Sequence, residues 1–193
     1  MTKPQLIGLT AYATSGKDAA AEALLPLGWE RRAFADQLRR FAYILNPLIE
    51  QRGSRGLGPR SKRYVHLADL VDDVGWDRAK TDNPQVREFL QRLGTDAGRQ
   101  LLGENVWVNA ALRDLVTGSG PVVFTDCRFP NEADAIRNLG GVIIRIIRPG
   151  VRPINGHPSE TAMDGYDVDW VLLNDGSLED LHAKMTRFVT ARH

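Results

Sequence analysis

Residues 6–18 read LIGLTAYATSGKD, and this stretch decides the fold. The apolar run at its start is typical of a buried parallel strand, and a loop of small residues follows it and ends in Gly16-Lys17. The backbone N–H groups of such a loop can wrap phosphates, and the lysine adds a positive charge near the β and γ oxygens. An alanine-rich helix expected next would direct its positive N-terminal end at the same phosphates. The stretch therefore favours a nucleoside-triphosphate-binding loop over an ordinary strand–turn–helix.

The loop departs at two positions from the usual pattern G-x-x-x-x-G-K-[ST]. Ala11 stands where the first glycine is expected, and its methyl group is tolerated if the backbone there has a negative φ. Asp18 replaces the hydroxyl residue that normally ligates Mg²⁺. A carboxylate also holds Mg²⁺, directly or through water, so Asp18 is a candidate metal ligand.

The composition of the 193 residues bounds the class of protein. With 42% hydrophobic and 25% charged residues, the chain suits one globular domain. A formal net charge of +1 argues against a protein that mainly coats nucleic acid. The single cysteine, Cys127, cannot form an internal disulfide, which fits a reducing compartment. Because no apolar stretch approaches the ~20 residues that cross a bilayer, and no signal peptide is apparent, we expect a cytoplasmic protein without a membrane partner.

Apolar runs expected to form strands alternate with helical patterns, which predicts an α/β fold with a central, mainly parallel sheet flanked by helices. The expected strands are residues 6–9, 29–34, 122–125, 142–147 and 171–173. The expected helices are residues 16–25, 36–45, 84 to about 102, 104–116 and 178–189. Gly94 inside the long helix costs ~1 kcal/mol relative to alanine, which indicates a break, a close packing contact or a nearby ligand.

Two segments differ from this alternation. Residues 51–63, QRGSRGLGPRSKR, mix glycine and proline with basic residues, and are expected to form either a solvated connection or a mobile flap that meets a ligand's phosphates. Residues 149–168 are rich in proline and glycine and are expected to form loops or a short lid. Because no domain linker is evident, residues 1–193 are expected to form a single domain.

The stretch Val122–Glu132, VVFTDCRFPNE, places an aspartate at the end of an apolar strand. Asp126 could reach a metal ion or its water shell from the carboxyl edge of the sheet, or it could cap the next turn. Arg128 could form a bidentate pair with a phosphate. Glu132 could line the same crevice or pair with Arg128 in a purely structural role.

A third informative stretch runs from Val86 to Val108. Arg87 and Gln91 are four residues apart and would share one helix face; the arginine suits a phosphate and the amide suits the edge of a base. Thr95 could donate its hydroxyl. Trp107 offers a flat surface for stacking a base, or it packs in the core.

The turn Asn174-Asp175-Gly176-Ser177 lies before the last helix, where its backbone could contact adenine or Ser177 could cap the helix. His157 has no partner at metal-ligand spacing, which argues against a zinc site. Neither the hydrolase pattern G-x-S-x-G nor the dinucleotide pattern G-x-G-x-x-G is present at the expected position.

Together these motifs resemble the deoxynucleoside monophosphate kinases encoded by bacteriophages. The resemblance rests on ATSGKD, FADQLRRFAY, VREFLQRLGTD with a following Trp-Val, TDCRFPNE and NDGSLEDL, in this order, and covers roughly residues 6–181. The GKD ending of the loop is shared with that family, so Asp18 agrees with the resemblance.

The resemblance implies a P-loop fold of the nucleoside monophosphate kinase type and the reaction ATP + dNMP → ADP + dNDP with Mg²⁺, for DNA precursor supply. It implies that Lys17, Asp126 and Arg128 are catalytic, and that Asp18 and Asp126 serve the metal, directly or through water. The positions expected to hold ATP are Ala13, Thr14, Ser15, Gly16, Lys17, Asp18, Ala19, Asn174 and Gly176. The positions expected to surround the deoxynucleotide are Arg39, Tyr43, Arg87, Gln91, Gly94, Thr95, Trp107, Asp126, Arg128 and Glu132.

Related members can be basic at the positions of Ala13 and Thr14, so here positive charge must come from Arg148, Arg152 or the arginines of residues 51–63. Three alternatives stay open: another small-molecule P-loop kinase, such as one acting on dephospho-coenzyme A; a nucleotide-binding module without turnover; and a nucleic-acid-binding protein that uses residues 51–63. The cluster of arginines favours a phosphorylated acceptor over a nucleoside, and no stable nucleic-acid partner is expected. The sequence leaves open which bases are accepted, whether ribose is rejected and whether the chain forms a homodimer. A phage-encoded chain would work in the host cytoplasm.

Overall fold

A computed structural model describes residues 5–51, 63–113, 115, 120–153 and 161–191. The chain divides into two compact units. The first, here the sheet unit, comprises Met1–Phe34 and Ala111–His193, and the second, the helical unit, comprises Ala35–Ala110. Each unit has its own hydrophobic core.

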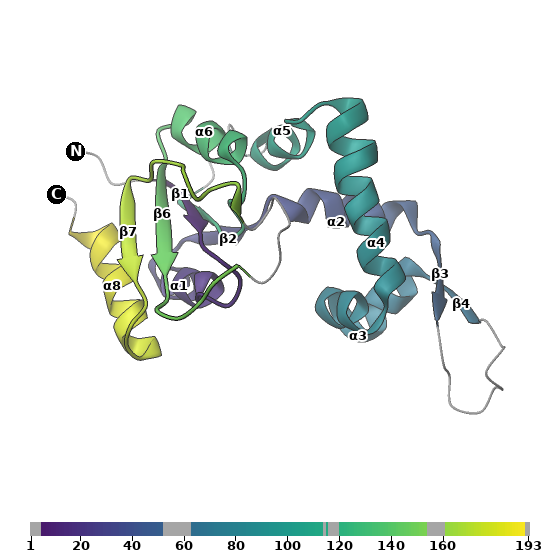
Figure 1. The fold of residues 1–193 in the computed structure, drawn as a ribbon, viewed down its shortest axis with the longest axis horizontal. Helices are drawn as coiled ribbons and strands as arrows, with labels where there is room; N and C mark the ends of the chain where they lie inside the picture. Colours follow the sequence, from purple (N-terminus) through teal and green to yellow (C-terminus); the bar gives the residue numbers. More distant parts are fainter. Residues whose placement is uncertain (1–4, 52–62, 114, 116–119, 154–160, 192–193) are drawn as a thin grey trace. The chain divides into compact units, whose positions relative to one another are not determined.

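A five-stranded sheet, parallel throughout, forms the centre of the sheet unit (Figure 1). The strands lie in the order β2 (Glu30–Arg32), β5 (Val122–Phe124), β1 (Leu6–Thr10), β6 (Val142–Ile147) and β7 (Trp170–Leu173). All strands that the sequence predicts are present, although β2 is shorter than expected. The parallel sheet of the predicted α/β fold is thereby confirmed.

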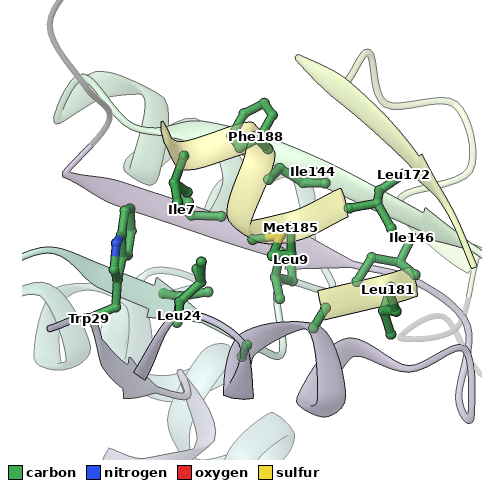
Figure 2. Packing of buried hydrophobic residues seen from close by; sticks show 14 residues of the cluster. Ile7, Leu9, Leu24, Trp29, Ile144, Ile146, Leu172, Leu181, Met185 and Phe188 are labelled. Atoms are coloured by element: carbon green, nitrogen blue, oxygen red, sulfur yellow. The ribbon is translucent and has the colours of Figure 1, made fainter. Parts of the chain in front are cut away.

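Helices cover both faces of this sheet (Figure 1). On one face, α1 (Lys17–Glu22) and α8 (Leu178–Thr190) pack over the strands. Figure 2 shows Ile7 and Leu9 of β1 among Leu181, Met185 and other apolar side chains of this cluster. On the other face α6 (Pro130–Asn138) packs closely against β1. A Cβ on Gly8 of β1 would lie only 2.7 Å from Ile136 Cδ1, so the glycine leaves room for the helix. A short 3₁₀ turn, η1 (Leu25–Leu27), follows α1.

The helical unit is built on α2 (Ala35–Leu45), α3 (Leu67–Asp82) and α4 (Pro84–Arg92). An antiparallel pair, β3 (Leu48–Gln51) and β4 (Arg63–His66), joins α2 to α3. The chain continues from α4 into a π-helical stretch, η2 (Leu93–Leu102), and then into α5 (Val106–Leu112), whose last residues belong to the sheet unit. Ala42, Ile49, Leu67, Val86 and Leu90 are among the residues that fill the core of this unit.

The structure departs from the expected elements in several places. The sequence analysis did not anticipate β3, β4, α3 or α6, whose short or mixed patterns give weak periodic signals. The helix expected over 104–116 is shorter, at Val106–Leu112. Most of the basic segment, residues 52–62, and residues 154–160 with His157 lie outside the described residues. Within the described ranges, no helix combines the length and apolar character needed to traverse a bilayer.

The long helix expected from residue 84 continues from Leu93 as a π-helix, and two glycines in this stretch allow other side chains to approach its backbone closely. A Cβ on Gly94 would lie 3.1 Å from Leu38 Cδ2, so a packing contact explains this glycine. A Cβ on Gly98 would lie 2.5 Å from Trp107 Nε1. The Trp107 indole N–H donates to the Gly94 carbonyl oxygen at 2.9 Å. The π-helical stretch is therefore held against α5 by one indole ring.

Replacing Gly98 by alanine should destabilise the protein. The rigid indole ring cannot yield to a new methyl group as a flexible side chain can, and overpacking of this kind costs about 1–3 kcal/mol. The free energy of unfolding, measured in urea by tryptophan fluorescence, should fall by this amount. Gly165→Ala is the matched control, because a Cβ there meets nothing within 4 Å. Equal stability of Gly98→Ala and the native protein would contradict the packing described here.

Candidate active site

The loop between β1 and α1 has a backbone that requires glycine at one position. Gly16 has a φ of 97°, in the left-handed region, and a Cβ there would lie 2.7 Å from Asn174 Nδ2. Thr14 is also left-handed, with a φ of 64°. The Asn174 side-chain amide donates to the carbonyl oxygen of the buried Ser15 at 3.0 Å. A residue that directly follows β7 thus fixes the loop that directly follows β1.

Cationic side chains bind the carbonyl oxygens of this loop. Lys17 Nζ donates to the carbonyl oxygens of Ala11 at 3.0 Å and Tyr12 at 3.2 Å. From the end of β6, Arg148 Nη1 donates to the Thr14 carbonyl oxygen at 3.4 Å. An ammonium and a guanidinium group therefore lie at the loop, which suits an anionic ligand.

A cavity of about 300 Å³ opens beside the loop, at the carboxyl ends of β1, β5 and β6. Here the strand order changes direction, with β5 and β2 on one side of β1 and β6 and β7 on the other. Open α/β sheets bind ligands at such a switch point. Arg128, Arg145 and Arg148 contribute to the cavity lining, and so do Tyr12 and Asp164.

The two carboxylates predicted to serve a metal already have protein partners. Asp126 Oδ1 accepts a hydrogen bond from the backbone N–H of Phe34 at 2.7 Å, which ties the end of β5 to the chain beyond β2. Asp18 Oδ1 lies 2.6 Å from Arg31 Nη2 in a pair whose side chains are both substantially exposed. Carboxylates are the right kind of ligand, since Mg²⁺ is typically bound by one or two carboxylates together with substrate phosphates. Among the described residues, no group of three or more His, Cys, Asp or Glu side chains could hold a metal ion.

The Glu132 carboxylate is hydrogen-bonded to the main chain at Arg128 and Phe129. The Glu132 carboxylate is buried, and its Oε2 accepts hydrogen bonds from the backbone N–H groups of Arg128 at 2.7 Å and Phe129 at 3.1 Å. These bonds fix the first turn of α6 and the backbone that presents the Arg128 side chain to the cavity. These main-chain hydrogen bonds give Glu132 a structural role that the sequence did not predict in this form.

Met163 and Asp164 line one side of the cavity, within a segment that the sequence predicted only as loops or a short lid. Tyr12 donates its hydroxyl to Asp164 Oδ1 at 2.9 Å, and this hydrogen bond raises the pKa of Tyr12. Arg145 donates to the carbonyl oxygens of Met163 and Tyr166. Burial, together with its hydrogen bond to Asp134, raises the pKa of Tyr166 to about 12. No short motif marks these contacts, because each joins residues far apart in the sequence.

The turn after β7 performs one of the two roles that the sequence left open for it, the helix cap, and also makes a contact that the sequence did not predict. Asn174 reaches the loop as described, and Ser177 caps α8 by accepting from the Asp180 backbone N–H at 3.2 Å. Gly176 lets the Asp180 carboxylate lie close to the backbone of the turn, since a Cβ on Gly176 would lie 2.5 Å from Asp180 Oδ2. The helix cap expected at Ser177 is confirmed.

The helical unit carries the other predicted contacts, and the structure separates them into two groups. Arg87, Gln91 and Thr95 are exposed on α4 and the start of η2. Tyr43, on α2, donates its hydroxyl to both carboxylate oxygens of Asp72, at 2.9 and 3.0 Å, and so faces α3. This hydrogen bond raises the pKa of Tyr43.

Trp107 and Arg39 already have contacts within the helical unit. Trp107 is only 9% exposed and packs in the core, which is the alternative that the sequence left open for it. Arg39 Nη1 lies 3.5 Å from Asp36 Oδ1, a weak surface pair. The residues predicted to surround a nucleotide in this unit therefore differ in how much of each side chain is accessible.

A parallel sheet whose first strand leads through a Gly-Lys loop into a helix, with cationic groups at the loop, defines the P-loop kinase class. A family model described as "Deoxynucleotide monophosphate kinase" matches residues 6–185. The "Putative deoxynucleotide monophosphate kinase" of Acanthamoeba polyphaga mimivirus is 31% identical over an alignment of 196 residues, which covers 93% of this chain and 93% of that protein. The "Deoxynucleotide monophosphate kinase" of Enterobacteria phage T4 is 33% identical over 135 residues, covering 66% of this chain and 54% of that protein.

The chain belongs to the deoxynucleotide monophosphate kinase family, and is thereby a phosphotransferase with ATP as co-substrate. Its match spans about half the length of the phage T4 relative. Among solved structures, the dephospho-CoA kinase from Campylobacter jejuni aligns over 98% of this chain and 99% of its own, with 14% identity and a TM-score of 0.45. The family assignment rests on the sequence matches alone.

Removing the Glu132 carboxylate should destabilise the sheet unit. In Glu132→Ala two part-buried backbone N–H groups lose the carboxylate that accepts from them, and leaving a buried group unsatisfied costs up to about 1–3 kcal/mol. Glu132→Gln keeps one acceptor oxygen and should recover part of that loss. Urea unfolding measures both variants, with the exposed Glu22→Ala as control. An unchanged midpoint in Glu132→Ala would show that these bonds contribute little.

Proposed function

We propose that this protein transfers the γ-phosphoryl group of ATP to the 5′-phosphate of a deoxynucleoside monophosphate, giving ADP and a deoxynucleoside diphosphate. The observation that carries the proposal is the Gly16-Lys17 loop beside the cavity lined by Arg128 and Arg148. Family membership supports the same reaction. A phage-encoded chain would work in the host cytoplasm and supply DNA precursors.

In this proposal the residues at the loop bind the donor. The backbone from Ala13 to Ala19 holds the ATP phosphates, and Lys17 leaves its carbonyl partners to bind the β and γ oxygens. Asn174 and Gly176 lie in the turn that contacts adenine. Because the Asn174 amide fixes the Ser15 carbonyl, the loop is preorganised before ATP arrives.

The acceptor is itself a phosphate, and this determines what the protein must supply. Its oxygens are ionised at neutral pH, so no strong general base is needed. Arginines neutralise the repulsion between the two anions and orient the attack. Arg39, Arg87 and Arg128 are the arginines proposed for this role. The remaining proposed nucleotide contacts are Gln91, Gly94, Thr95 and Asp126.

Asp18 and Asp126 are the residues proposed to hold Mg²⁺, directly or through water. The ion supplies charge neutralisation of the transferred phosphoryl group when it is bound. To bind the ion, Asp18 must give up its exposed ion pair with Arg31. This costs little, because surface ion pairs contribute only about 0–1 kcal/mol.

A coupled assay of ADP formation across all deoxy- and ribonucleoside monophosphates tests the proposal. ADP should form only when a monophosphate is added, and Lys17→Ala should lower kcat by about 10²–10³, as for other preorganised charge contacts. Lys80→Ala is the matched control, because Lys80 pairs with Asp77 on the surface of α3. Nucleotide binding without turnover would identify a binding module. Near-normal turnover in Lys17→Ala would remove the loop from the mechanism.

Arg148 is the residue proposed to replace the positive charge missing at Ala13 and Thr14. Arg148→Gln should raise the KM for ATP by about 10- to 100-fold, since hydrogen bonds to charged groups contribute about 1.5–3 kcal/mol. The KM for the monophosphate should stay near its native value. Arg152→Gln, at an exposed position four residues away, is the control and should behave like the native protein. Equal effects of the two substitutions would assign the role to neither residue.

A further inference from the structure

Most of the Trp107 indole is occupied by contacts within the protein. Its N–H donates to the Gly94 carbonyl oxygen at 2.9 Å, and its ring lies where a Cβ on Gly98 would be, within 2.5–2.8 Å of three ring atoms. The side chain is 9% exposed. A base could not displace these contacts without opening the packing of η2 against α5.

A second aromatic ring lies against Trp107 and is far more accessible. Phe41 of α2 is 47% exposed, and its ring meets the Trp107 ring edge-on, with centroids 6.1 Å apart at 73°. An exposed phenyl ring on a helix contributes little to folding. Its edge contact with a buried indole fixes its orientation, while much of its surface stays open to solvent.

The residues proposed to read the nucleotide lie on the same side of the helical unit as Phe41. Arg87, Gln91, Gly94 and Gly98 follow one another at spacings of four, three and four residues, and so form one stripe along α4 and η2. Trp107 packs on Gly98 at the end of this stripe, and Leu38, one turn before Phe41 on α2, packs on Gly94.

Tyr43, the aromatic residue of α2 that the sequence favoured, lies on another side of the helix. It is two residues after Phe41, which rotates it by about 200° around the helix axis. Its hydroxyl binds Asp72 on α3. Phe41 is therefore the aromatic residue of α2 on the side of Arg87 and Gln91.

We propose that Phe41 is the surface on which the base of the acceptor nucleotide stacks, and that Trp107 is a positioning residue that orients the Phe41 ring. This rests on the proposed function, since it names the base contact of the same acceptor. Every base has a π face, so stacking on Phe41 gives affinity with little selection among bases. Gln91, with its amide donor and acceptor, then contributes the selection.

Binding to the complete chain tests the assignment. Equilibrium affinity for each deoxynucleoside monophosphate is compared with affinity for 2-deoxyribose 5-phosphate, which has the phosphate and sugar but no base. Phe41→Ala and Phe41→Leu should weaken nucleotide binding by about 5- to 100-fold, the range for loss of one stacked base, and leave sugar-phosphate binding unchanged. Phe41→Tyr should keep the affinity. The KM for ATP should not change.

Leu48→Ala is the matched control, because Leu48 is an apolar side chain of the same unit, 58% exposed, and lies on β3 and not on α2 or the stripe. It should bind like the native protein. Phe41→Leu keeps an apolar side chain of similar size. If this variant has native thermal stability but binds the nucleotide more weakly, the loss is due to the missing aromatic face and not to a change in the fold. Unchanged nucleotide affinity in Phe41→Leu and Phe41→Ala, or an equal loss for the sugar phosphate, would overturn the proposal. Absence of monophosphate-dependent ADP formation by the native chain would instead overturn the proposed function.

Discussion

The left-handed turn at Gly16, fixed by Asn174, is the constraint on which the rest of the sheet unit depends. A side chain at Gly16 would collide with the Asn174 amide, and that amide holds the Ser15 carbonyl. The contact joins the loop after the first strand to the turn after the last. Because β1 lies at the centre of a parallel sheet and β7 at its edge, the loop geometry is a property of the whole sheet.

The residues proposed for the chemistry fall in both units. The sheet unit gathers cationic groups at the carboxyl ends of its strands, where Lys17, Arg128 and Arg148 lie around the loop and its cavity. The helical unit presents exposed Arg87, Gln91 and Phe41 on helices held by their own core. A rigid core under each set of side chains fixes their spacing in advance, and phosphoryl transfer relies on such positioning more than on covalent chemistry.

Several side chains with the right chemistry for a ligand serve the scaffold. Glu132 caps the turn that carries Arg128, Trp107 locks the π-helical stretch, and Arg145 fastens residues 163–166 to β6. A carboxylate, an indole or a guanidinium group can perform either role, and residue type and spacing alone do not distinguish them. Burial and hydrogen-bond partners do, and both depend on residues distant in the sequence.

The sequence by itself determined the strands of the parallel sheet and the Gly-Lys loop, because these depend on local periodicity and on glycine geometry. It missed β3, β4, α3 and α6, whose patterns are short or interrupted, as at the kink of α3 at Gly75. Only the tertiary structure decided that Trp107 is packed while Phe41 is open, and that Tyr43 faces Asp72. Those outcomes follow from helix packing, which sets how much of each side chain remains accessible.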